Sequence, residues 1–229
     1  MLASATGTEE AGSAEYQNDH MGKIFREGFS FSGFERDKLY LSRGGKRFED
    51  ISGLSGIDAV GDGRGAAYAD FDNDGDLDIF LTQLQGQVHK LFRNNVGQDQ
   101  NWLRVQLRGT ASGRDAWGAE VRVGTSRGTQ TRLKSAGSGF VSQRDGRLLF
   151  GIGADAGVQW MEVRWPSGTV QRFGQLAAGV SVEVVEGEDS LHYLDLARAQ
   201  LPDPADEQIR FLQALRYGLG DEFPPLLII

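Results

Sequence analysis

The 229-residue sequence contains no cysteine, three histidines and five prolines. The absence of cysteine excludes disulfide bonds, zinc–thiolate sites and cysteine nucleophiles. No apolar run approaches the roughly 20 residues that a membrane-spanning helix needs. Basic residues are outnumbered by acidic ones, and the formal net charge of −8 argues against general nucleic-acid binding. The absence of cysteine does not, however, fix the compartment in which the protein works.

The amino-terminal residues are small, polar and acidic, and they lack the basic start and apolar centre of a signal peptide. We expect residues 1–22 to form a flexible lead-in. Charge is uneven in the rest of the chain. Basic residues are in excess between Asn101 and Arg147, and acidic residues are in excess from Glu186 to Ile229. Such runs usually mark solvated surfaces, although the basic segment could also form a face that binds polyanions.

Glycine, in contrast, is abundant, and 32 glycines are roughly twice the ordinary usage. An excess of glycine without a collagen-like period indicates many tight turns and therefore a mainly β protein. Two strand-like segments, 38–43 and 47–52, flank Gly44-Gly45 and predict a strand–turn–strand unit. We expect residues 23–99 to form a series of hairpins of this kind.

Residues 100–187 show a cleaner alternation of apolar and polar side chains. Leu103, Val105 and Leu107 alternate with polar residues, and about seven such segments follow one another with glycine-rich turns between them. This spacing predicts an antiparallel β-sandwich or barrel.

The segment 188–229 has a different character. A helix is expected from the N-cap Asp203 to Gly218, and a weaker helix is expected over Ser190–Gln200. The sequence therefore predicts a two-helix tail. The chain ends with an exposed apolar group that we expect to dock on a protein partner, namely Phe223, Leu226, Leu227, Ile228 and Ile229.

The most informative segment is ADFDNDGDLDIF, residues 69–80, in which aspartate occupies every second position. Like charges at this spacing repel one another unless a cation binds them or solvent surrounds them. Carboxylates at loop positions 1, 3, 5 and 9, a glycine at position 6 and a backbone carbonyl at position 7 supply the oxygen ligands that calcium prefers. The candidate ligands are Asp70, Asp72, Asp74, Asp76 and Asp78.

Other interpretations of this loop are weaker. Position 12 is Leu81 instead of the bidentate glutamate of a helix–loop–helix site, so a calcium loop within a β-hairpin is favoured. Magnesium would use fewer carboxylates and keep more water, and zinc would find no cysteine and only three widely separated histidines. An acidic turn without a metal remains the alternative.

The segment AAYADFDNDGDLDIFL resembles an FG-GAP/VCBS repeat, the calcium-loop hairpin of propeller blades. The downstream segments NWLRVQLRGTASGRDAWGAEVRV, SAGSGFVSQRDGRLLFGIG and MEVRWPSGTVQRF resemble the ASPIC/UnbV domain, which accompanies such repeats. The resemblance covers roughly residues 27–186. It implies Ca²⁺ at the aspartate loop, propeller-blade-like hairpins followed by a β domain, and an extracytoplasmic location that is periplasmic, cell-surface or secreted.

No constellation of catalytic residues is recognisable. His20, His89 and His192 lie far apart in the sequence, and GSGFVSQ lacks the pattern of a nucleophile elbow. We therefore expect a non-catalytic, calcium-binding interaction module, an accessory or structural subunit of a larger assembly. Two alternatives remain open: a module that binds acidic polysaccharides through its arginine-rich segment and its tryptophans, and an accessory domain of an enzyme.

Overall fold

The computed structural model describes residues 35–83 and 89–199, and these residues are mainly β-structure. They fall into two compact units. One comprises the described residues up to Ala66 together with Phe80–Phe92, and the other comprises Ala67–Ile79 and the residues from Arg93 onward. The expected lead-in, the helix from Asp203 to Gly218 and the apolar chain end lie outside the described residues.

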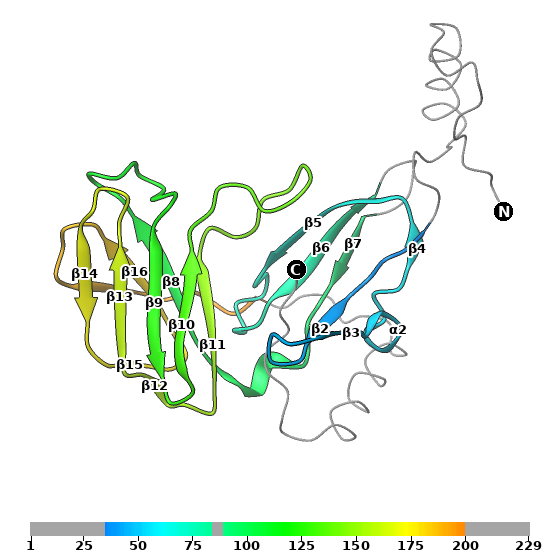
Figure 1. Cartoon of the computed structure of the whole chain (residues 1–229), viewed down its shortest axis with the longest axis horizontal. Coiled ribbons are helices and arrows are strands. Elements are labelled where there is room, and N and C mark those ends of the chain that lie inside the picture. Colours follow the sequence, from blue (N-terminus) through cyan, green and yellow to red (C-terminus); the bar gives the residue numbers. More distant parts are fainter. Residues whose placement is uncertain (1–34, 84–88, 200–229) are drawn as a thin grey trace, which may run out of the picture. The chain divides into compact units, whose positions relative to one another are not determined.

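The first part of the chain forms short hairpins (Figure 1). Strand β2 pairs with β3 in an antiparallel arrangement, β1 pairs with β4, and β5, β6 and β7 form a three-stranded sheet in that order. Gly44 and Gly45 adopt left-handed φ values of 62° and 73° between β2 and β3, which confirms the predicted strand–turn–strand unit. The elements are β1 (Glu35–Arg36), β2 (Tyr40–Ser42), β3 (Phe48–Asp50), α2 (Ser52–Ser55), β4 (Val60–Gly61), β5 (Gly63–Ala69), β6 (Asp78–Gln83) and β7 (Lys90–Phe92).

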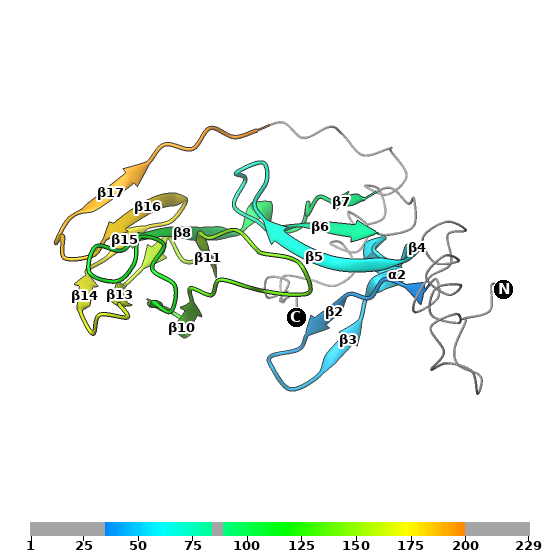
Figure 2. The same ribbon diagram turned by 90° about the horizontal axis from the view of Figure 1, so that it is seen from above.

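The remainder builds two four-stranded sheets, in the orders β10-β9-β13-β14 and β11-β8-β16-β17, with a small β12-β15 pair. Figure 2 shows β17 beside β16 at the edge of the second sheet. The elements are η1 (Gly97–Asp99), β8 (Asn101–Arg108), β9 (Glu120–Thr125), β10 (Gly128–Leu133), β11 (Leu148–Gly153), β12 (Gly157–Val158), β13 (Trp160–Arg164), β14 (Val170–Phe173), β15 (Leu176–Ala177), β16 (Val180–Val185) and β17 (Leu191–Leu194).

The alternation seen in the sequence explains the core of these two sheets. Inward residues of both sheets belong to a single apolar cluster, and Leu103 and Val105 of β8, Val121 of β9 and Val163 of β13 are fully buried in it. The expectation of a β-sandwich agrees with this packing. Among the described residues the two sheets stay open and do not close into a barrel.

Two features differ from expectation. The sheet is not wholly antiparallel, because β8 and β16 pair in parallel, with Leu103 opposite Val180. The helix expected over Ser190–Gln200 is wrong in its described part: Leu191–Leu194 is strand β17, antiparallel to β16. The physical reason is that β16 would otherwise present an unpaired edge, and Leu191 packs against the apolar core from this position.

Candidate metal centre

The aspartate-rich loop connects β5 to β6, and its conformation follows from its own sequence. Asn73 and Gly75 both adopt left-handed backbone conformations, with φ values of 59° and 99°. Asparagine and glycine are the residues that enter this region most readily. The resulting turn points backbone N–H groups at the carboxylates: Asp70 accepts hydrogen bonds from the N–H groups of Asp74 and Gly75, each at 3.0 Å.

Three of the five predicted ligands converge. Carboxylate oxygens of Asp70, Asp72 and Asp74 all lie within 4.8 Å of one another. Asp74 in turn accepts a hydrogen bond from the N–H of Asp76 at 3.1 Å. This arrangement gathers hard, anionic oxygen donors in one place, which is the donor set that Ca²⁺ prefers and that soft metals do not.

Asp78 has a structural role. Its side chain is fully buried, and its two oxygens accept hydrogen bonds from the N–H groups of Phe71, at 3.0 Å, and Asn94, at 2.8 Å. It thereby ties the start of the loop to the segment after β7. Burial raises the pKa of Asp78 to about 6, although the two backbone hydrogen bonds act in the opposite direction.

Asp76 is the residue that points most directly to a bound cation. It is 6% exposed, and neither of its carboxylate oxygens has a hydrogen-bond partner among the described residues. Burial, reinforced by the charges of Asp74 and Asp78, raises the pKa of Asp76 to about 9. A buried carboxylate without a partner is costly, and a divalent cation would remove that cost. The residues present therefore fit a calcium ion.

A buried arginine supports the loop from β8. Arg104 is 2% exposed and forms an ion pair with Asp70, and its guanidinium also donates to Asn73 at 3.3 Å. The same group lies over the ring of Trp102, 4.9 Å from the ring centroid. Burial lowers the pKa of Arg104 to about 10, so the group stays protonated at neutral pH. Alternation alone hid this residue, because an arginine on a strand normally points to solvent.

Three further contacts connect the loop to the rest of the second unit. Gly75 lies against Trp102, and a Cβ at this position would come within 1.8 Å of the indole Nε1. The segment after β17 also contacts the loop. The N–H of Ala199 donates to the carbonyl of Asp72 at 2.8 Å, and Arg198 lies 3.4 Å from the carboxylate of Asp74. The aspartate-rich loop is consequently part of the same compact unit as β8 to β17.

A second polar cluster, which sequence reasoning missed, surrounds Glu186 just after β16. Its carboxylate accepts hydrogen bonds from the N–H groups of Thr110 and Ser112 and from the hydroxyls of Ser112 and Ser167. Burial alone would raise the pKa of Glu186, but these hydrogen bonds outweigh it and lower the pKa to about 2. The sequence feature that could have indicated it is a glutamate placed directly after the apolar strand β16. Its contacts indicate a structural role, in which Glu186 connects the loop that contains Thr110 and Ser112 to the turn that contains Ser167.

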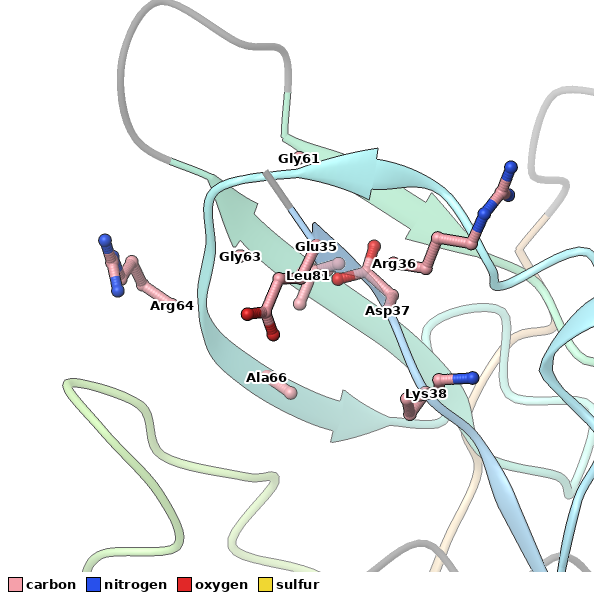
Figure 3. Close-up of a pocket in the computed structure, with 9 residues that line it drawn as sticks. All are labelled: Glu35, Arg36, Asp37, Lys38, Gly61, Gly63, Arg64, Ala66 and Leu81. Carbon is pink, nitrogen blue, oxygen red and sulfur yellow. The ribbon is translucent and has the colours of Figure 1, made fainter. Parts of the chain in front are cut away.

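The first unit contains a cavity of about 290 Å³ (Figure 3). Its lining mixes acidic and basic side chains, Glu35 and Asp37 with Arg36, Lys38 and Arg64, around the apolar Leu81. Burial raises the pKa of Asp37. Among the described residues that line this cavity there is no histidine, serine or threonine, so these residues bring together no nucleophile with an activating base.

The remaining candidate residues of the sequence are not gathered into a site. His89 accepts a hydrogen bond from the N–H of Gln83 at 3.1 Å, and His192 lies 2.8 Å from Glu188. His20 and the apolar group Phe223 to Ile229 lie outside the described residues. No helix within residues 35–83 and 89–199 is long and apolar enough to cross a bilayer.

With this geometry in place, comparison with known sequences identifies the modules. The FG-GAP-like repeat family matches residues 29–81, and the family named ASPIC and UnbV matches residues 109–191. The chain therefore carries an FG-GAP-like repeat and an ASPIC and UnbV domain. This confirms the resemblance on which the sequence interpretation depends.

Among curated proteins, the chain is homologous to cartilage acidic protein 1. It is 32% identical to the Homo sapiens protein over 162 residues, which is 68% of this chain and 24% of that protein. It is 31% identical to the Xenopus tropicalis protein over 166 residues, which is 69% of this chain and 25% of that protein. The chain thus spans about a quarter of the length of the curated relatives it matches. The modules and this homology suggest a β-rich, extracellular-type protein.

Proposed function

We propose that this chain is a non-catalytic, calcium-stabilised β module that works by binding other macromolecules in an extracytoplasmic assembly. The observation that carries the proposal is Asp76, a buried carboxylate that has no hydrogen-bond partner in the described part of the chain and follows three converging carboxylates. When bound, a calcium ion would supply positive charge to the cluster formed by Asp70, Asp72, Asp74 and the neighbouring Asp76. The chain's own contribution is to hold the loop in position through Arg104 and Gly75.

The packing of the loop supports a structural role for the ion. Because the loop contacts β8 and the segment after β17, a cation that neutralises the carboxylates would stabilise this whole unit. Millimolar calcium, typical of extracellular sites, is sufficient for loops with dissociation constants of about 10⁻⁴–10⁻³ M. A protein partner at the apolar residues Phe223 and Leu226 to Ile229 stays a prediction.

The test is a calcium titration of the metal-free chain by isothermal titration calorimetry, with thermal unfolding measured in parallel. We expect one calcium site, a higher melting temperature with Ca²⁺ than with EDTA, and a smaller rise with Mg²⁺. Asp72→Asn should abolish these effects. Asp115→Asn, which makes the same charge change in an exposed turn, should preserve them. A melting temperature that is the same in calcium and in EDTA would contradict the proposal.

A further inference from the structure

The outer face of β9, β13 and β14 carries a compact group of arginines that the calcium loop does not involve. Inward residues of these strands, such as Val121, Met161 and Val163, are fully buried. The alternate residues therefore face outward. In the strand register Glu162 lies directly opposite Arg122 on one side and Arg172 on the other. Figure 1 shows β13 between β9 and β14, so these three side chains form a row across the sheet.

One carboxylate is shared among three guanidinium groups in this row. The Nε atoms of Arg164 and Arg172 each lie 2.7 Å from an oxygen of Glu162, and Arg122 lies 3.8 Å from it. These ion pairs lower the pKa of Glu162, so the carboxylate stays charged and keeps the arginines in place. The side chain of Glu162 is 8% exposed, whereas those of Arg122, Arg164 and Arg172 are 36%, 52% and 75% exposed.

The arginines are thus held at their inner ends and open to solvent at their outer ends. Binding through Nε leaves the terminal Nη groups of Arg164 and Arg172 available for a second anion, and a guanidinium can engage a sulfate or carboxylate with two parallel hydrogen bonds. The other carboxylate on this face is Glu120, which lies opposite Arg164 in the register. Three arginines against two glutamates leave the face positive, although the whole chain is negative.

An aromatic ring lies beside this group. Trp160 precedes Glu162 by two residues on β13 and so points to the same face, opposite Gly124 of β9. A Cβ on Gly124 would come within 2.1 Å of the indole Nε1, so the ring lies over the glycine. Trp160 is only partly buried in this position. A flat, partly exposed indole next to oriented guanidinium groups offers both apolar contact and anion recognition.

We propose that this arginine face, formed by Arg122, Arg164, Arg172 and Trp160, binds an acidic polysaccharide through its sulfate or carboxylate groups. Arg122 and Arg172 lie two strand spacings apart, about 9–10 Å, which suits charged groups repeated along an extended chain. A nucleic acid is a poorer match, because its continuous phosphate backbone requires a wider basic surface and this chain carries a net charge of −8.

The experiment compares two double variants of the full chain. Arg164→Ser with Arg172→Ser removes two charges from the face. Arg47→Ser with Arg108→Ser removes two charges elsewhere and is closely matched, because the side chains of Arg47 and Arg108 are 73% and 50% exposed and each pairs with a glutamate. Binding to immobilised heparin, hyaluronan and neutral dextran is measured, with single-stranded DNA and vesicles of anionic lipid as competing polyanions. Circular dichroism checks that each variant is folded.

The wild-type chain is expected to bind heparin, hyaluronan or both, and not dextran. Retention by heparin alone identifies sulfate as the recognised group, and retention by both identifies shared recognition of carboxylates. The face variant should bind at least tenfold more weakly, and the control variant within about twofold of wild type. Equal losses in the two variants, an unchanged face variant, or equally tight binding of DNA or vesicles would overturn the proposal.

The outcome is distinguishable from that of the proposed function. None of these residues contacts the aspartate loop through a hydrogen bond or ion pair described for it, so binding to the polysaccharide should persist in EDTA at a temperature where the sheets remain folded. A chain that binds calcium and not heparin would overturn this inference alone. A chain that binds heparin and is indifferent to calcium would overturn the proposed function alone.

Discussion

Asp76→Asn is expected to change stability in opposite directions with and without calcium. In the calcium-free protein, no residue within 35–83 and 89–199 donates a hydrogen bond to the buried Asp76 carboxylate, and its pKa is raised to about 9 from an ordinary value of 3.8. An acid with a raised folded-state pKa destabilises the fold above its unfolded-state pKa. At pH 7 the difference amounts to about 4 kcal/mol. An asparagine of the same shape removes this cost, although its buried amide keeps a desolvation penalty of about 1–3 kcal/mol.

The variant should therefore be more stable than wild type in EDTA, by about 1–3 kcal/mol, or several degrees in melting temperature. In 5 mM calcium, a site with a dissociation constant of about 0.1 mM would stabilise wild type by about 2 kcal/mol, or 4–8 °C. Asp76→Asn should gain less than half of this, because one anionic group of the cluster is missing.

Differential scanning calorimetry in EDTA and in 5 mM calcium measures both effects, with Asp115→Asn as the control. The control should behave as wild type in the two buffers. A lower melting temperature of Asp76→Asn in EDTA would show that the carboxylate has a favourable partner, contrary to the structure. An equal gain from calcium in wild type and variant would show that the ion does not use this cluster.

Three further predictions concern the supports of the fold. Gly75→Ala should destabilise the fold by about 3 kcal/mol and weaken calcium binding, because it adds a Cβ at φ 99° and within 1.8 Å of Trp102. Chemical denaturation measures the loss of stability, and titration calorimetry measures the loss of calcium affinity. Arg104→Met should lower the melting temperature by leaving Asp70 without its buried cation, and hydrogen exchange should show lost protection in the loop. Glu186→Gln should cost about 2 kcal/mol at pH 7. The pKa of Glu186 is lowered to about 2 in the folded state, from an ordinary value of 4.5. The ionised carboxylate therefore stabilises the fold above pH 4.5, and this stabilisation is lost as the pH falls towards 2. The difference in unfolding free energy between wild type and Glu186→Gln should shrink over that interval.

The sequence carried enough information to predict the strands and the loop. The alternation of apolar residues predicts that Leu103, Val105 and Leu107 lie in the core, as they do, and the spacing of the aspartates indicates the candidate ligands. These patterns are local, since they depend on the period of a strand and on the geometry of a single turn. The chain segments involved need no distant partner to be recognised.

The parts that sequence reasoning missed depend on contacts between distant residues. Strand β17 was expected to be helical, because its short apolar pattern does not reveal the edge of β16 with which it pairs. The burial of Arg104 depends on its ion pair with Asp70, which lies on a loop before β8, so the alternation along β8 does not reveal it. Two of the residues that donate to Glu186, Thr110 and Ser112, lie 76 and 74 residues earlier in the chain. The conformation of β17 and the burial of Arg104 and Glu186 all depend on contacts between distant parts of the chain, which the local sequence pattern does not reveal.

The parallel pairing of β8 with β16 has a consequence for how the chain is made. Side chains on these two strands meet although they are 77 positions apart in the sequence, as Arg104 and Ser181 are. Contacts of such high contact order form slowly, because a long loop must close before they contribute. During synthesis, β8 leaves the ribosome long before β16 exists, and until then one edge of β8 has no neighbour. A nascent chain that stops before Val180 would present that apolar edge to other chains, and chaperone binding or aggregation of such fragments is the expected outcome.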